Sequence, residues 1–272
     1  MMNILVVVED NRGSMHRMSK EAIAGAQKIG GNITALVIGA NADAIADQLS
    51  SIALENTLVV KHELVSSYNS DGYTEVVKQV IQSINPSIII IGHTYQTRDF
   101  MPRVSARLDI PFIPDIIGLE QDAYTKQVLN SKLNSSVSSL SDMKILSFQS
   151  ACFSAEDMLT GRSSSQNFDV DLGPSMIRSS SEEPFQESAA EVDLESAELI
   201  VSVGRGIEKE DNIPIAFTLA EVLGAEVSAS RPVIDSGWLP SFRQIGSSGQ
   251  NVSPKLYFAM GISGAIQHVV GM

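Results

Sequence analysis

The feature that most constrains this chain is a run of four isoleucines, residues 88–91, in which no polar residue alternates with the apolar ones. A strand of this kind is apolar on both faces, so both faces must be covered by other parts of the chain. Similar short β-branched runs occur at residues 3–8, 32–38 and 57–61, and helical patterns separate them. Covered strands joined by helices predict an α/β fold with a mostly parallel sheet and right-handed crossovers.

Two of the intervening helices have clear sequence signals. In residues 73–84 the apolar side chains recur at the helical period and form one buried stripe, and Pro86 then ends the helix. Residues 19–29 form an earlier helix that ends at the Gly30-Gly31 pair, because glycine readily adopts the left-handed conformation found just after a helix.

The length of 272 residues favours two domains, given about 150 residues per domain. Between residues 131 and 190 the helical period is lost and 17 of 60 residues are serine, which indicates hairpins followed by a linker. Regular alternation resumes with strands at 199–203, 226–229 and 256–260 and a helix at 213–223. We therefore expect an N-terminal α/β domain over residues 1–160 with no cofactor, a serine-rich linker over 161–193, and a C-terminal domain over 194–272.

Composition excludes several classes of function. The chain is 43% hydrophobic and 19% charged, which is typical of a globular protein. Its 19 basic and 32 acidic residues give a net charge of −13, which disfavours nucleic acid as a partner. The single cysteine, Cys152, cannot form an internal disulfide, so a reducing cytoplasm is the expected compartment. The first apolar run is short and follows no basic segment, so we do not expect it to be a signal peptide, and polar residues and glycines in 256–272 argue against a membrane span.

The positive charge that is present collects near the C-terminus. Residues 1–226 carry 16 basic and 31 acidic side chains, whereas residues 227–272 carry three basic residues and one acidic residue. A positive segment at the strand ends of an α/β domain suits an anionic ligand. Surface basic residues that balance the acidic first domain explain the same distribution equally well, so charge alone leaves both interpretations open.

Two glycine-rich segments follow expected strands. Residues 261–265, Gly-Ile-Ser-Gly-Ala, stand between a strand and a helix, where free N–H groups can bind a phosphate, although ordinary turn chemistry is the commoner reason for such glycines. Gly204-Arg205-Gly206 also follows a strand, but Lys209 occupies the third glycine position of a dinucleotide fingerprint, which disfavours a standard NAD site. The segment 244–249 is a hydroxyl pair bounded by glycines, most often a turn.

Residues that could carry catalysis are sparse. His268 lies four residues after Gly264, near the possible anion site, but a lone helical histidine is more often structural. The other histidines, at 16, 62 and 93, lack metal-ligand spacing, so we expect no metal site. Cys152 has no histidine nearby and is not expected to be a nucleophile.

Taken together, several C-terminal segments closely resemble the electron transfer flavoprotein alpha-subunit family in order and spacing. They are Val201-Ser202-Val203-Gly204-Arg205-Gly206, Ala229-Ser230-Arg231-Pro232, Gln244-Ile245-Gly246-Ser247-Ser248-Gly249, Pro254-Lys255-Leu256-Tyr257 and the run 261–268. In the N-terminal half, Ile91-Gly92-His93-Thr94, Arg98-Asp99, Pro102-Arg103 and Ala106-Arg107-Leu108 resemble the same family. The resemblance covers nearly the whole chain.

The resemblance implies a nucleotide-binding-like N-terminal domain and a Rossmann-like C-terminal domain that binds FAD. Residue by residue, it implies that Arg231 lies against the isoalloxazine, Ser248 bonds near N5 and Gln244 contacts the flavin or ribityl chain. It further implies that Ser263, Gly264 and Ala265 hold the pyrophosphate, while Gln267 and His268 complete the site near the ribityl chain and the N1/C2 edge. The cofactor-binding residues expected on this basis are Arg231, Gln244, Ser247, Ser248, Gly249, Gly261, Ser263, Gly264, Ala265, Gln267 and His268.

The implied function is an electron carrier rather than an enzyme with its own substrate. Such a chain pairs with a beta-type subunit that usually binds AMP, accepts electrons from a dehydrogenase and passes them to a downstream acceptor. This chain has Ser247-Ser248 where relatives carry Gln-Thr, and Gln250 where they carry Lys. Relatives also continue past position 272 with a segment that contacts the adenosine, so weaker FAD binding is expected here.

Two other functions are compatible with the sequence to a lesser degree. A truncated or divergent member of the family could have lost FAD and act as an assembly or interaction subunit. A nucleotide-binding hydrolase or ligase built on the first domain is disfavoured, because Glu9-Asp10-Asn11 stands where a glycine-rich phosphate loop would follow the first strand.

Overall fold

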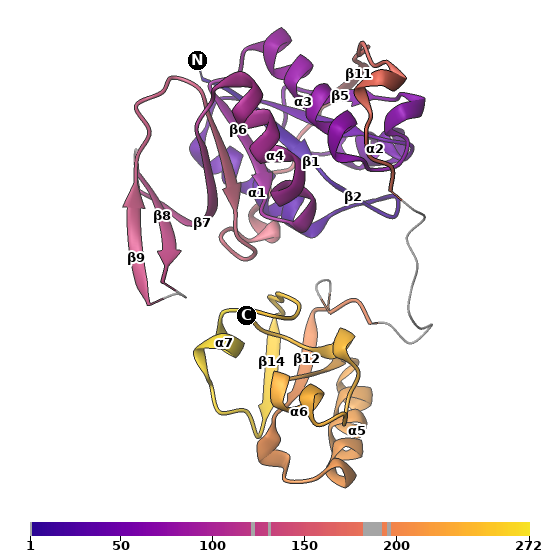
Figure 1. The fold of residues 1–272 in the computed structure, drawn as a ribbon, viewed down its shortest axis with the longest axis vertical. Helices are drawn as coiled ribbons and strands as arrows, with labels where there is room; N and C mark the ends of the chain where they lie inside the picture. Colours follow the sequence, from indigo (N-terminus) through magenta and orange to yellow (C-terminus); the bar gives the residue numbers. More distant parts are fainter. Residues whose placement is uncertain (1, 121–122, 130–131, 182–191, 195–196) are drawn as a thin grey trace. The chain divides into compact units, whose positions relative to one another are not determined.

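The computed structural model describes residues 2–120, 123–129, 132–181, 192–194 and 197–272. The chain divides into two compact units, the first made of residues 1–127 and 134–183 and the second of residues 128–133 and 184–272 (Figure 1). Each unit has a mostly or fully parallel sheet with flanking helices, which confirms the α/β fold class.

In the part of the chain that is described, the first unit is built on a nine-stranded sheet with the order β11-β5-β4-β1-β6-β10-β7-β8-β9. Neighbouring strands from β11 to β7 pair in parallel, whereas β8 runs antiparallel to β7. The strands are β1 (Asn3–Val8), β4 (Asn32–Ile38), β5 (Asn56–Val60), β6 (Ile88–Gly92), β7 (Phe112–Glu120), β8 (Ala123–Val128), β9 (Leu133–Val137), β10 (Lys144–Phe148) and β11 (Ser164–Asn167), with a separate ribbon of β2 (Asp10–Asn11) and β3 (Ser14–Met15).

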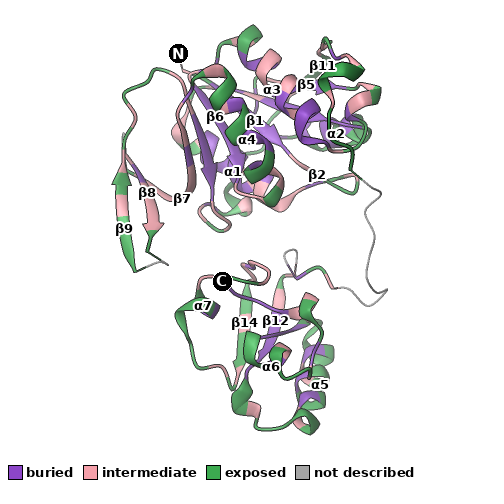
Figure 2. Ribbon diagram, viewed as in Figure 1, coloured by how far each residue is buried: buried purple, intermediate pink, exposed green. Residues whose placement is uncertain are grey.

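Helices cover both faces of this sheet, as the uninterrupted apolar strands predict. They are α1 (Arg17–Ile29), α2 (Ala42–Leu49), α3 (Ser70–Ile84) and α4 (Tyr95–Leu108). Alternate side chains of β1 enter different cores, because successive residues of a strand point to opposite faces. Ile4 and Val6 pack with α1 and α2, whereas Leu5 and Val7 pack with α3 and α4. The resulting double core is seen as the buried centre of the first unit in Figure 2.

The prediction that the linker starts at residue 161 is wrong. Residues 164–167 form β11, which pairs in parallel with β5 at the border of the sheet. All four side chains of β11 are exposed, so the strand is held by backbone hydrogen bonds and carries no apolar pattern that sequence reasoning could detect. Residues 182–191 of the expected linker lie outside the described residues, whereas residues 168–181 are described and in part attached to the first unit.

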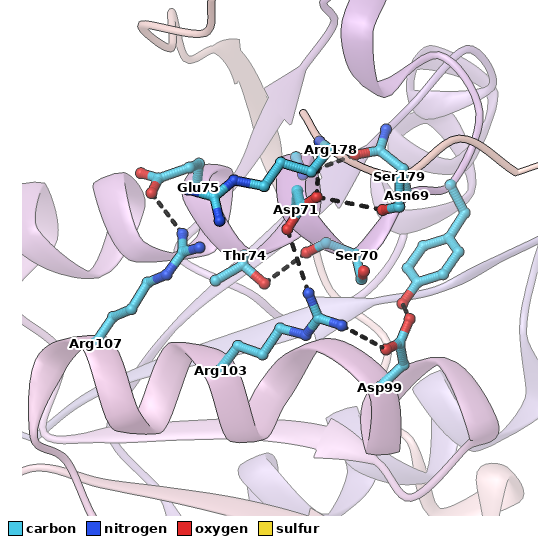
Figure 3. A network of polar contacts seen from close by, with 12 residues as sticks. Asn69, Ser70, Asp71, Thr74, Glu75, Asp99, Arg103, Arg107, Arg178 and Ser179 are labelled. Carbon is cyan, nitrogen blue, oxygen red and sulfur yellow. Dashed lines mark hydrogen bonds and ion pairs between the residues drawn. The ribbon is translucent and has the colours of Figure 1, made fainter. Parts of the chain in front are cut away.

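The segment after β11 is fastened to α3 by polar side chains (Figure 3). Gln79 exchanges two hydrogen bonds with the backbone of Asp171, at 2.8 and 2.9 Å. The buried carboxylate of Asp71 accepts the backbone N–H of Arg178 at 2.9 Å and the hydroxyl of Ser179 at 3.3 Å. Arg103 of α4 donates to the same carboxylate at 3.2 Å. We call this set of contacts around Asp71 the Asp71 clamp.

The second unit is smaller and contains a parallel sheet with the order β13-β12-β14. Its elements are β12 (Leu199–Val203), α5 (Ile213–Leu223), β13 (Glu226–Ala229), α6 (Arg231–Asp235), β14 (Leu256–Met260) and α7 (Ile266–Val269). One face of the sheet packs on α5 through Val201 and Ala216, among others, and the other face packs on a loop through Ile200 and Val252. The sequence analysis predicted β12, α5, β13 and β14 with the bounds observed here.

We expect Asp71→Ala to lower the free energy of unfolding by about 1.5–3 kcal/mol, because the clamp uses hydrogen bonds to a buried charged group. Urea unfolding measures the loss. The matched control is Asp43→Ala, which removes an exposed pair with Lys61 and should cost at most about 1 kcal/mol. Equal losses in the two variants would contradict a structural role for the clamp.

The clamp also predicts a pH dependence. The Arg178 N–H, more than any other contact, holds the pKa of Asp71 below its usual value, so the contribution is complete above the unfolded pKa of about 3.9. It is lost as the pH falls through the lower pKa of the folded state. The stability difference between the parent and Asp71→Asn should therefore shrink below about pH 4, as urea unfolding at a series of pH values would show.

Candidate functional site

The three strands described for the second unit end at the same edge of the sheet, and a turn follows each of them there. Gly204 follows β12, Ser230 follows β13 and Gly261 follows β14. The N–H of Ser230 donates to the carbonyl of Val203 at 2.9 Å, and the N–H of Gly204 donates to the carbonyl of Met260 at 2.8 Å. The backbone hydrogen bonds between the strands therefore continue into the turns. Ligands of open α/β sheets bind beyond the carboxyl ends of the strands, as this arrangement permits.

A cavity of about 680 Å³ lies at this edge. That volume is within the range of about 300–1,000 Å³ found for small-molecule and cofactor sites. The lining comes from all three turns, the loop at 244–248 and α7. The lining residues are Arg205, Gly206, Ser230, Arg231, Pro232, Asp235, Gln244, Ile245, Gly246, Ser247, Ser248, Gly261, Ile262, Ser263, Ala265, Gln267 and His268.

Glycines allow two of the turns to touch. The N–H of Gly206 donates to the carbonyl of Gly261 at 2.9 Å. A Cβ on Gly204 would overlap that same carbonyl, and a Cβ on Gly261 would lie 2.6 Å from the backbone of Gly206. Gly261 also has φ +67°, which side chains disfavour. The close approach of the turns after β12 and β14 therefore depends on glycine.

The loop at 244–250 closes another side of the cavity. Gln244 is buried and its amide Nε2 donates to the Ser248 hydroxyl at 2.9 Å. The N–H of Ser247 donates to the carbonyl of Gln267 at 2.7 Å, which joins the loop to α7. Ser247 and Ser248 remain exposed on the cavity side, where their hydroxyls are accessible to a ligand.

The charges around the cavity favour an anion. Arg205 and Arg231 both line it, and both are exposed. Asp235 stands one turn after Arg231 on α6 and approaches it, with 3.4 Å between Nε and Oδ2. Because that pair is largely exposed to water, the carboxylate offsets the arginine only in part.

The turn after β14 offers unpaired donors. Among the described residues, the backbone N–H groups of Ser263, Gly264 and Ala265 donate to no acceptor of the protein. Gly264 has φ +72° and open space where a Cβ would stand. Consecutive N–H groups of this kind bind oxyanions such as phosphates.

His268 is the buried titratable group of the cavity, with 6% of its surface exposed. Its Nε2 lies 2.6 Å from the hydroxyl of Tyr257, on β14. Burial lowers the pKa of His268, while the Ile245 backbone acts to raise it. Burial therefore favours the neutral form of the ring.

Almost all of the residues expected from the sequence meet around this one cavity. Arg231, Gln244, Ser247, Ser248, Gly261, Ser263, Ala265, Gln267 and His268 line it. Gly249 and Gly264 are absent from the lining, although each follows a lining residue in the chain. A Cβ on Gly249 would overlap the carbonyl of Gln244, so the observed conformation of the loop requires glycine at this position.

Sequence reasoning missed other lining residues, notably Arg205, Ser230 and Asp235. Arg205 and Ser230 stood in segments already singled out, but nothing local indicates that the turns after β12 and β13 face one cavity. Asp235 could have been found from its i,i+4 spacing to Arg231 on a helix.

The donor set fits FAD. Two arginines and a run of free N–H groups suit a pyrophosphate, hydroxyl and amide side chains suit the ribityl chain and ring edges, and Ile245, Ile262 and Pro232 supply apolar surface. Over the described residues, no group of three or more histidine, cysteine or acidic side chains could hold a metal ion. The described helices include none with the length and apolar character needed to span a membrane.

The close contact between the turns after β12 and β14 can be tested by substitution of Gly261. We expect Gly261→Ala to lower the free energy of unfolding by more than the ~1–2 kcal/mol that a left-handed backbone costs a side chain, because its Cβ would also overlap the turn after β12. The matched control is Gly224→Ala, with φ +65° and open space around the Cβ position. Thermal and urea unfolding compare the two, and equal losses would show that the two turns do not touch.

Comparison with known proteins agrees with this geometry. Residues 4–172 match the family model described as "Electron transfer flavoprotein domain", and residues 193–272 match the one described as "Electron transfer flavoprotein FAD-binding domain". The chain is 34% identical over 276 residues to the electron transfer flavoprotein subunit alpha of Bacillus subtilis (strain 168), covering 99% of this chain and 84% of that protein.

Two further relatives show the same extent of similarity. The electron transfer flavoprotein subunit alpha of Thermoanaerobacterium thermosaccharolyticum is 33% identical, over 99% of this chain and 85% of the relative. The probable mitochondrial electron transfer flavoprotein subunit alpha of Caenorhabditis elegans is 33% identical, over 98% of this chain and 81% of the relative. The chain thus belongs to the electron transfer flavoprotein alpha-subunit family.

Proposed function

We propose that the cavity at the carboxyl edge of the β13-β12-β14 sheet is the FAD site of an electron-carrying subunit. The observation that carries this proposal is the meeting of three strand-end turns, two arginines and free N–H groups around one cavity of cofactor size. The FAD-binding family model matches this same unit, and FAD is the cofactor. The chain is a carrier and not an enzyme with its own substrate, because the chemistry belongs to the cofactor.

Each side of the cavity has its own part in holding the cofactor. The N–H groups of Ser263, Gly264 and Ala265 receive the pyrophosphate, with Arg205 as its counter-charge. Gln244 and Ser248, already joined by a hydrogen bond, present polar atoms to the flavin edge around N5. Gln267 and His268 of α7 stand toward the ribityl chain and the N1/C2 edge.

FAD, when bound, supplies one- and two-electron redox chemistry, and the residues around it set the energy of that chemistry. Arg231 places a positive charge at the cavity, next to the isoalloxazine in this proposal. Reduction adds negative charge to the ring system, and a fixed cation favours the more negative state. The charge of Arg231 would thereby raise the reduction potential of the bound FAD.

The alpha-subunit family indicates a heterodimer with a beta subunit. We propose that this partner binds AMP, and that a dehydrogenase and a downstream acceptor are the electron donor and acceptor. We also propose the cytoplasm as the compartment, because the lone Cys152 cannot form an internal disulfide.

The direct test is an absorption spectrum of the purified chain, alone and with a beta-type partner, followed by chromatography of the heat-released cofactor. We expect flavin absorption near 450 nm and recovery of FAD, because the turn at 261–265 is arranged for a pyrophosphate. Recovery of FMN alone would contradict the assignment of that turn. A chain that takes up no flavin under any of these conditions would favour an interaction subunit.

A second test concerns Arg231. We expect Arg231→Ala to lower the midpoint potential of the bound FAD, with about 59 mV per electron for each tenfold change in the reduction equilibrium. Titration against a redox dye measures the shift. The matched control is Arg162→Ala, an exposed arginine of the first unit, which should leave the potential unchanged. An unchanged or higher potential in Arg231→Ala would place that side chain away from the ring.

A further inference from the structure

Asp235 is the single acidic side chain among the described residues that line the cavity. The other fully charged residues of the lining are Arg205 and Arg231, and residues 227–272 contain no second acidic residue. A carboxylate repels an anionic ligand such as FAD and weakens the attraction that the two arginines provide. The placement of Asp235 in this lining therefore calls for an explanation.

Helix α6 fixes the direction in which Asp235 points. Arg231 and Asp235 stand four residues apart on this helix, so their side chains lie one above the other on the same face. Val233, between them, is fully buried in the core that α5 covers. The N–H of Trp238 donates to the carbonyl of Val233 at 3.2 Å, which fastens the end of the helix. The pair is thus carried by an anchored element and is turned from the core toward the cavity.

The stability of α6 does not account for this pair. Oδ2 of Asp235 lies 3.4 Å from Nε of Arg231, and both side chains are exposed. Helices favour acids near the N-terminal end and bases near the C-terminal end, and an acid that precedes its partner base forms the better pair. Here Arg231 is the first residue of α6 and Asp235 is the last. The order is the reverse of the stabilising one, and exposed pairs contribute little to folding, so the cavity is the better explanation.

A ligand in the cavity changes how strongly these charges act. In the proposed function the isoalloxazine of FAD lies next to Arg231, and the bound cofactor covers lining residues that otherwise face water. Charges that lose contact with water interact more strongly, because less solvent screens them. Reduction gives the flavin negative charge, which a nearby cation favours and a nearby carboxylate disfavours. Asp235 therefore acts on the flavin in the direction opposite to Arg231.

We propose that Asp235 tunes the reduction potential of the FAD site: its carboxylate partly cancels the charge of Arg231 at the flavin and keeps the potential below the value that Arg231 alone would give. This inference rests on the proposed function, because the bound group is FAD. Asp235 exchanges neither protons nor electrons with the cofactor and acts through its charge alone. An acid and a base on one turn of α6 thus shift the potential in opposite directions.

The test compares the midpoint potential of FAD bound to the full chain and to its variants, by titration against a redox dye. We expect Asp235→Asn to raise the potential by the equivalent of an about two- to tenfold change in the reduction equilibrium, or about 9 to 30 mV for a two-electron couple. Asparagine has nearly the same size and keeps one oxygen that can accept from Arg231, so the charge is the main change. Asp235→Glu keeps the charge and should shift the potential less than Asp235→Asn.

The matched control is Glu198→Gln. Glu198 is also an exposed acid paired with a base, Lys255, at 3.4 Å. The two residues directly precede β12 and β14, so they lie at the edge of the sheet opposite to the cavity. This variant should leave the potential unchanged. A shift as large as that of Asp235→Asn would mean that the effect comes from the net charge of the unit and would overturn the proposal.

The Arg231→Ala background separates the charge of Asp235 from its contact with the arginine. We expect Asp235→Asn to raise the potential in this background as well, because the carboxylate acts by its own charge. An effect that disappears without Arg231 would mean that Asp235 only holds the guanidinium in place, and that result contradicts the proposal.

The binding of oxidised FAD, followed by flavin fluorescence, provides a measurement that does not depend on reduction. Asp235→Asn should not raise the dissociation constant, because it removes a negative charge from a site for an anion. A higher dissociation constant would show that Asp235 maintains the shape of the cavity instead, and the proposal would be wrong.

The remaining outcomes separate this inference from the proposed function. If the chain binds FAD but Asp235→Asn leaves the potential unchanged or lowers it, the tuning role is overturned and the proposed function stands. A chain that takes up no FAD overturns the proposed function and this inference with it. Asp235 is exposed and outside the cores, so its substitution should not prevent folding, which thermal unfolding of the FAD-free chain would check.

Discussion

The site of this protein depends on the parallel pairing of β12 with both of its neighbours. Pairing in parallel places the carboxyl ends of β12, β13 and β14 at one edge, so the turns that follow them must share the same space. The turns after β12 and β14 approach until the N–H of Gly206 reaches the carbonyl of Gly261. Residues far apart in the chain, such as Arg205 and His268, thereby line one cavity.

The two units use the same architecture on different scales. In the first unit, helices cover both faces of the sheet, and two large cores share the alternate side chains of its central strands. The second unit has a narrower sheet and smaller cores, and Leu256 and Phe258 of β14 remain exposed. A unit with a small core gains proportionally more from a bound ligand, because binding to the folded state alone adds directly to stability. Binding of FAD to this unit is therefore expected to stabilise its fold.

Sequence reasoning succeeded for elements whose own residues carry the signal. β1, β4, β12 and β13 have the predicted bounds because their apolar side chains face a core, and α5 and β14 have the predicted bounds because apolar runs at the period of a helix or strand are bounded by turn residues. It failed at β11, whose four exposed polar residues are held only by the backbone of β5. It also did not foresee the Asp71 clamp, in which a carboxylate of α3 meets backbone and hydroxyl groups more than a hundred residues away.

The same distinction applies to the candidate site. The sequence by itself determined the fold class, the family resemblance and most of the residues that line the cavity, because these depend on residue type and on order along the chain. Only the tertiary structure decided that Arg205 and Asp235 belong to the lining, that Gly249 shapes its loop and that Tyr257 touches His268. The physical reason is that these contacts arise from the pairing of strands and the packing of turns, and no short stretch of sequence records which distant group will be the neighbour.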